Sequence, residues 1–189
     1  MKYQIRIGLS LGIITFLSLD LACRHENKIN IEVQSMYNQK VIIPIDSFYV
    51  IHPHSENHLL HGVDQKQRQR LIVYSDSLVC SSCKILELEK WESFFASKSS
   101  YKNVFDAIFI FNPSHKDLEV LKFAIKSQEI SFPIYIDTLG VFKKMNHYLP
   151  DNSLLHTFLI DKEGKIILVG SPLDNKMIEK MFLEIIGTK

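Results

Sequence analysis

The chain has 189 residues, of which 46% are hydrophobic and 11% aromatic, and this composition excludes a disordered or collagen-like protein. Its 22 basic and 21 acidic side chains nearly balance, so the sequence lacks the excess of positive charge that is typical of nucleic-acid-binding proteins. With three cysteines in all, a scaffold built on several disulfides is also excluded.

The first 22 residues have the layout of a secretory signal. Lys2 and Arg6 precede an apolar stretch over residues 7–19, which is too short for a comfortable membrane span. The motif LDLAC resembles the lipobox of bacterial lipoproteins, although Asp20 stands where those signals have an aliphatic residue. We therefore predict a signal peptide over residues 1–22, lipidation of Cys23, and a mature chain held on a membrane outside the cytoplasm. A plain cleaved signal and an uncleaved apolar anchor are the alternatives.

Residues 23–67 are predicted to form a tether, an N-terminal β-hairpin and a polar loop. The short apolar and β-branched runs INIEVQS, KVIIPI and SFYV favour two or three strands between residues 29 and 50. The stretch that follows, HPHSENHLLHGVDQKQRQR, is polar and has no sustained period, which is typical of a loop.

Residues 68–189 are predicted to form a single domain in which strands and helices alternate. Strands are predicted at 70–75, 106–111, 132–137, 156–161 and 165–170, and helices from Ser81 onward and within 112–128, 138–148 and 175–186. Strand-helix-strand units make parallel pairs, and the closing hairpin around the KEG turn adds an antiparallel partner. The predicted fold class is α/β, with a mixed sheet and helices on both faces.

Cys80 and Cys83 lie between the first strand of this domain and the helix that follows it. The unpaired N–H groups and the dipole at a helix start favour an anion, and hence the thiolate form of Cys80. Cys83 is one turn further along, so Cys80 could attack a partner's disulfide and Cys83 could release the mixed intermediate. Two inert cysteines in a packed core, or a metal clamp, are the alternatives.

The CxxC pair in this element order, together with HTFLIDKEGKIILVGSPLDNKMIEKMFLEII, resembles the thioredoxin-like thiol-disulfide oxidoreductases of the bacterial envelope, the TlpA type, over about residues 68–187. This resemblance implies a thioredoxin-like three-layer sandwich, and the N-terminal hairpin matches an extension that such proteins often carry. It implies catalysis by Cys80 and Cys83 without a cofactor. The implied partners are protein thiols or disulfides of the cell envelope, and the membrane is bound through the lipid.

Two positions depart from the family pattern. The family has a cis-proline before the Thr of its T-F-x-I-D strand, whereas this chain has His156 before Thr157. A cis bond at a residue other than proline costs about 3 to 4 kcal/mol, so we expect a trans bond there. Thioredoxins keep an Asp six residues before the first cysteine, where this chain has Tyr74. Glu87, one turn beyond the pair, or Asp76 could take the role of that acid, and Glu87 is preferred.

His156 has three interpretations. In the place of the cis-proline it would face Cys80, in a loop that normally presents backbone groups to the substrate. As an imidazolium it would stabilise the thiolate of Cys80. With both thiolates it would offer a ligand set for copper(I) or zinc, as in the Sco-type copper chaperones, whose cysteines are spaced differently. A thioredoxin-fold binding module without turnover is a further alternative for the whole chain.

Overall fold

The computed structural model describes residues 27–51, 68–76, 81–98, 104–128 and 130–187, and the side chains of residues 81–86 are not among the described parts. The chain falls into two compact units, Met1–Ser35 and Met36–Lys189. Within the described ranges, no helix combines the length and the apolar character needed to cross a membrane. The predicted signal peptide and Cys23 lie outside these ranges.

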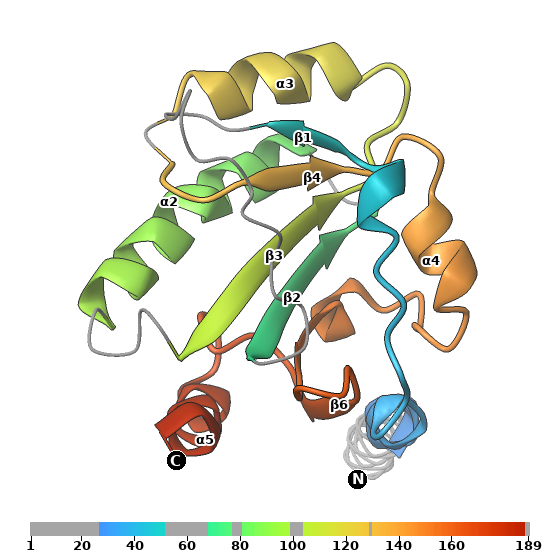
Figure 1. The fold of residues 1–189 in the computed structure, drawn as a ribbon, viewed down its shortest axis with the longest axis vertical. Coiled ribbons are helices and arrows are strands. Elements are labelled where there is room, and N and C mark those ends of the chain that lie inside the picture. Colours follow the sequence, from blue (N-terminus) through green and yellow to red (C-terminus); the bar gives the residue numbers. More distant parts are fainter. Residues whose placement is uncertain (1–26, 52–67, 77–80, 99–103, 129, 188–189) are drawn as a thin grey trace, which may run out of the picture. The chain divides into compact units, whose positions relative to one another are not determined.

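The second unit contains a mixed six-stranded sheet, with the strand order β1-β4-β3-β2-β5-β6 (Figure 1). The strands are β1 (Tyr49–Ile51), β2 (Gln69–Ser75), β3 (Phe105–Phe111), β4 (Ile134–Ile136), β5 (Thr157–Ile160) and β6 (Ile166–Val169). The three central strands β2, β3 and β4 are parallel, and β1, β5 and β6 are each antiparallel to their neighbours. The carboxyl ends of the parallel strands therefore meet at one edge, where ligand and active sites of α/β sheets commonly lie.

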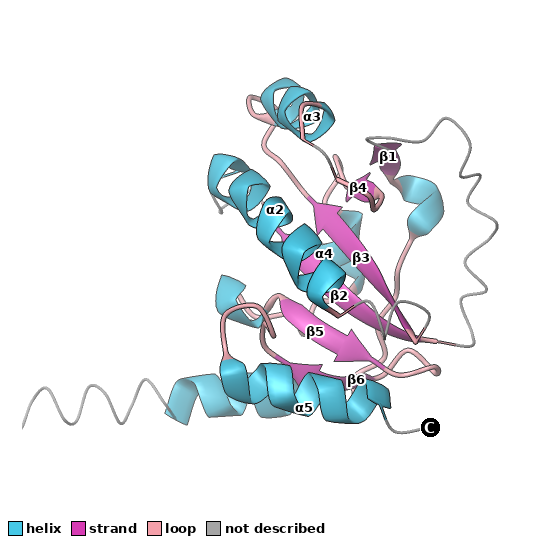
Figure 2. Cartoon of the chain, turned by 90° about the vertical axis from the view of Figure 1, so that its left-hand side faces the viewer, coloured by secondary structure: helices cyan, strands magenta, loops and turns pink. Residues whose placement is uncertain are grey.

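Helices cover both faces of this sheet. Helices α2 (Ser81–Ser97), α3 (Leu118–Lys126) and α5 (Lys176–Gly187) share one hydrophobic core with one face, and Figure 2 views the sheet from the side of α2 and α5. Helix α4 (Val141–Met145) packs on the other face, where the ring of Phe142 lies 5.0 Å from that of Tyr74 on β2. The side chains of each strand alternate between these two cores, as the pleat requires.

From β2 onward, the elements follow the predicted order. The chain runs β2, α2, β3, α3, β4, α4, β5, β6 and α5, with parallel strand-helix-strand units and a closing antiparallel hairpin. The α/β fold with a mixed sheet and helices on both faces is confirmed, and this arrangement is the thioredoxin-like fold.

The predicted N-terminal β-hairpin is wrong. Residues 27–36 form a helix, in which Lys28 and Glu32 make an ion pair of 3.8 Å one turn apart. After a 3-10 turn at Ile45–Ser47, the single strand β1 pairs with β4 and not with a neighbour in sequence. The alternation of Ile29, Ile31 and Val33 has the period of a strand, but β-propensity depends on a partner strand, and local helix formation prevails here.

Residues 38–42 bind along the edge of the sheet and to α4. The backbone N–H of Asn38 donates to the carbonyl of Ile166 at 2.9 Å, and Lys40 forms an antiparallel bridge with Lys165, so this segment lies beside β6. The side chain of Asn146, just after α4, accepts from the N–H of Ile42 at 2.9 Å and donates to its carbonyl at 2.8 Å. Asn146 is fully buried, so these bonds fix the segment against α4.

Asp137 fixes the start of α4 at the end of β4. This fully buried carboxylate accepts from the backbone N–H of Val141 at 3.0 Å and of Phe142 at 2.8 Å. We expect Asp137→Ala to lower the free energy of unfolding by about 1 to 2 kcal/mol, because two helix-start N–H groups lose their acceptor. Urea unfolding measures the change, with Asp174→Ala as the control at an exposed turn. Equal effects of the two substitutions would contradict this role of Asp137.

Candidate functional site

The cysteine pair falls at the predicted junction. Strand β2 ends at Ser75 and helix α2 begins at Ser81, so Cys80 directly precedes the helix and Cys83 is in its first turn. The helix start expected from the sequence is confirmed. Cys80 and the side chain of Cys83 lie outside the described parts, and the proximity of the two sulfur atoms stays a prediction.

Asp76 is buried at the carboxyl end of β2, four residues before Cys80. Its side chain is 5% exposed, and its carboxylate lies 3.5 Å from the Nζ of Lys143 on α4. Lys143 also contacts the carboxylate of Asp151 at 2.8 Å. The hydrogen bond that Lys143 donates to Asp151 and the charges of both carboxylates raise the pKa of Lys143, while its partial burial acts in the opposite direction. The ammonium group is therefore charged at neutral pH and partly neutralises the buried Asp76.

The acid preferred from the sequence, Glu87, lies on α2 and is half-buried. Asp76 is the more buried of the two and stands closer to the end of β2. The structure brings Asp76 together with Lys143, which sequence reasoning did not select. The two residues are 67 positions apart, so no local pattern signals their contact.

His156 is buried at the end of a 3-10 turn, Ser153–Leu155, directly before β5. The peptide bonds of the described residues are all trans, so the expected trans bond at His156 is confirmed. Its Nε2 lies 2.7 Å from the carbonyl oxygen of Pro150. Because a carbonyl only accepts, Nε2 carries the proton in the neutral ring. No described residue forms a hydrogen bond with the other ring nitrogen, Nδ1.

The surroundings of His156 favour the uncharged imidazole. Burial lowers its pKa, although the hydrogen bond to the Pro150 carbonyl and the charge of Asp76 act in the opposite direction. The ring lies 5.2 Å from that of Tyr74, on the side of the sheet where α4 packs. A neutral ring gives no support to the imidazolium interpretation of His156. Cys80 lies outside the described parts, so contact between the ring and Cys80 stays a prediction.

Tyr74 occupies the position where thioredoxins keep their buried Asp. Its side chain is buried, and burial raises the pKa of the phenol, with the nearby Asn112 side chain acting in the opposite direction. No hydrogen bond of standard geometry reaches the hydroxyl from the described residues. This position therefore supplies an aromatic wall in place of a carboxylate.

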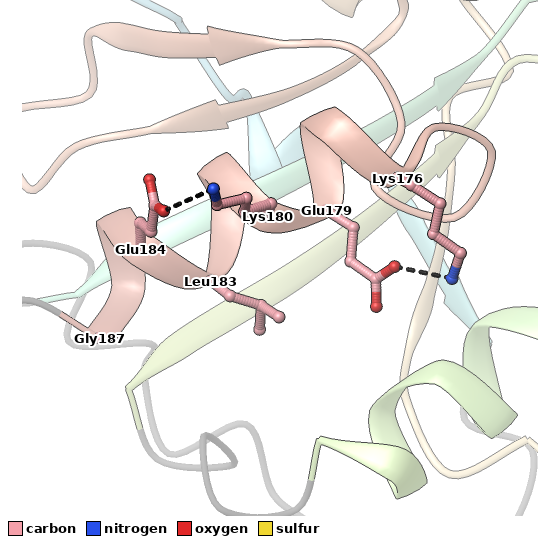
Figure 3. A pocket seen from close by; sticks show the side chains of 6 residues that line it. All are labelled: Lys176, Glu179, Lys180, Leu183, Glu184 and Gly187. Carbon is pink, nitrogen blue, oxygen red and sulfur yellow. Dashed lines mark hydrogen bonds and ion pairs between the residues drawn. The ribbon is translucent and has the colours of Figure 1, made fainter.

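A surface pocket of about 680 Å³ lies at the carboxyl ends of the central strands, beside Asp76. It is lined by Asn112, Thr138, Leu139, Gly140, Lys143, Lys144, His147, Leu149, Pro150 and Asp151. A second groove, of about 480 Å³, is lined by residues of α5 alone (Figure 3). Its charged side chains form ion pairs within the helix, Lys176 with Glu179 at 2.9 Å and Lys180 with Glu184 at 3.9 Å.

The described residues contain no group of three or more His, Cys, Asp and Glu side chains that could hold a metal ion. The ligand set suggested by the sequence consists of Cys80, Cys83 and His156, and its two cysteine side chains lie outside this part of the structure. Copper or zinc binding by that set stays an alternative that binding measurements would decide.

No protein-family model and no curated protein matches the sequence. Among solved structures, the chain is similar to a Chlorobium tepidum protein assigned as the thiol:disulfide interchange protein DsbE, with a TM-score of 0.48 and 14% identity over 65% of this chain and 83% of that chain. It is also similar to StoA from Bacillus subtilis (TM-score 0.42, 18% identity, 61% and 84% covered). A third similar structure is the exposed lipoprotein thioredoxin Etrx1 from Streptococcus pneumoniae (TM-score 0.43, 17% identity, 65% and 87% covered). Because these scores are low, the fold assignment rests on the strand order and pairing described above.

Proposed function

We propose that the chain is a thiol-disulfide oxidoreductase that exchanges the dithiol and disulfide forms of Cys80 and Cys83 with protein partners. The observation that supports this most directly is that β2 ends at Ser75 and α2 begins at Ser81, so that in the sequence Cys80 directly precedes the helix and Cys83 is in its first turn. In this position the helix start favours the thiolate of Cys80, which is the nucleophile of exchange.

In the reducing direction, the thiolate of Cys80 attacks one sulfur of a partner's disulfide. A bond forms between Cys80 and that sulfur, and the other partner sulfur leaves as a thiolate and takes a proton. Cys83, once deprotonated, then attacks the sulfur of Cys80 and releases the second partner thiol. The partner gains two electrons and the pair becomes a disulfide, so the step balances, and the reverse sequence oxidises a partner.

The carboxylate that accepts the proton of Cys83 is proposed to be that of Glu87 or Asp76. Burial of Asp76 beside Lys143 supports Asp76, whereas the position of Glu87 one turn along α2 supports Glu87. His156 is proposed to act as a positioning residue through its uncharged ring, which packs on Tyr74. The lowering of its pKa by burial is consistent with this role.

The site of action is proposed to be the bacterial cell envelope. The signal-like residues 1–22 and the LDLAC motif support export and lipidation of Cys23. The thioredoxin-like domain would then face the periplasmic side of a membrane, where close cysteine pairs can be oxidised.

A trapping experiment tests the exchange function. In the variant Cys83→Ser, the intermediate cannot be resolved, so partner proteins should accumulate as disulfides linked to Cys80. Non-reducing electrophoresis and mass spectrometry of envelope extracts measure these adducts. The variant Cys80→Ser is the matched control and should trap far fewer partners, because its remaining thiol is the resolving one. If Cys83→Ser traps no partner at all, the chain is not an exchange enzyme, and the binding module without turnover becomes the better description.

A further inference from the structure

Three lysines gather where the N-terminal segment meets the closing hairpin of the sheet. Lys40 and Lys165 are direct partners in an antiparallel bridge, and Lys162 lies in the turn between β5 and β6. All three side chains are exposed. We refer to Lys40, Lys162 and Lys165 as the lysine patch.

The backbone holds two of these lysines together. The N–H of Ile166 donates to the carbonyl of Gln39 at 3.0 Å, and the N–H of Val41 donates to the carbonyl of Gly164 at 2.8 Å. These bonds flank the bridge between Lys40 and Lys165, and residues directly opposite each other in such a pair project to the same face. Like charges in this arrangement are destabilising, so the fold maintains an unfavourable pair at this edge.

The lysine patch makes no ion pair within the part of the chain that the structure describes. Asp161 accepts from the backbone N–H of Lys165 at 2.8 Å, and its charge acts on the buried guanidinium of Arg70. Glu163, in the same turn, is exposed and makes no ion pair with the lysines. Since the three lysines outnumber Asp161 and Glu163, the two carboxylates of the turn, this part of the described surface has a net positive charge.

We propose that the lysine patch docks on the phosphate groups of anionic lipids in the membrane that carries the chain. This inference rests on the proposed lipidation of Cys23. Residues 24–35 separate Cys23 from Met36, where the second unit begins, and a segment of that length spans at most about 40 Å, or less because residues 27–36 are helical. The tether is thus short enough for the patch to reach the headgroups, and basic side chains near an anionic membrane surface are attracted to it. Docking of the patch would orient the sheet relative to the membrane.

Amine labelling of the lipidated chain on vesicles tests this proposal. The chain is reconstituted into vesicles of phosphatidylcholine, with or without phosphatidylglycerol, and acetylation of each lysine is followed by mass spectrometry. The three patch lysines should react about fivefold more slowly on the anionic vesicles, as a stabilisation of the order of 1 kcal/mol per lysine implies. High salt should remove this protection because the attraction is screened.

Two double variants make the test specific. In Lys40→Gln/Lys165→Gln, Lys162 should lose its protection, whereas Lys116→Gln/Lys126→Gln removes the same charge beside α3 and should leave it intact. Equal labelling on both kinds of vesicle, while the mass of the Cys23 peptide shows the lipid, would overturn the proposal. Equal protection by inorganic phosphate on neutral vesicles would also overturn it, since it would assign the patch to a free anion. Disulfide exchange by the same samples is measured separately and should be unchanged in both variants.

Discussion

Replacing Trp91 with alanine should lower the free energy of unfolding by about 3 to 5 kcal/mol. The side chain is 2% exposed, and its ring lies 5.7 Å from each of the rings of Phe94, Phe95 and Phe109. The indole thereby joins α2 to β3, and its truncation leaves a cavity and removes three aromatic contacts. Since a domain is stable by only about 5 to 15 kcal/mol in total, the helix that carries Cys83 should loosen as well.

Urea unfolding followed by circular dichroism measures this loss, because Trp91 is the only tryptophan and its fluorescence disappears in the variant. Phe123→Ala is the matched control, since Phe123 is an aromatic residue of α3 that is 76% exposed. Its effect should stay within about 0.5 kcal/mol, as is usual for exposed positions. A Trp91→Ala variant as stable as Phe123→Ala would contradict the packing of α2 on β3.

The part of the fold that follows from local patterns could be predicted from the sequence. The helical period of Leu88, Trp91 and Phe94 marks the buried side of α2, and the run at residues 70–75 marks a strand buried on both faces. The N-terminal segment could not be predicted in this way, because the alternation at residues 29–33 fits a strand equally well. Whether such a segment forms a strand or a helix depends on whether a partner strand is available to pair with it.

In the candidate site, too, the local features could be predicted from the sequence and the long-range contacts could not. The helix start beside Cys80 and Cys83 is a local feature, and the sequence predicts it correctly. The contact of Asp76 with Lys143 joins residues 67 positions apart, and it depends on where α4 packs on the sheet. Burial of His156 against the Pro150 carbonyl likewise follows from the path of the loop before β5, which no spacing rule encodes.

Between neutral pH and about pH 5, the free energy of unfolding should fall, and His156 should account for part of that fall. Burial lowers the pKa of His156 in the folded chain, whereas in the unfolded chain it has the ordinary value of about 6.5. The unfolded chain therefore binds more protons in this range. The contribution of His156 to stability is complete above about pH 6.5 and is lost as the pH falls toward the folded-state pKa, by up to about 1.4 kcal/mol per pH unit.

The variant His156→Gln isolates this contribution. Glutamine does not titrate and can still donate a hydrogen bond toward the carbonyl of Pro150, so the difference between the two stability curves reports the imidazole alone. Tyr74→Phe is the control, because it changes the side chain facing the ring and leaves the imidazole in place, so the slope should persist. Parallel curves for the wild type and His156→Gln between about pH 7 and 5 would show that His156 is not held neutral by burial.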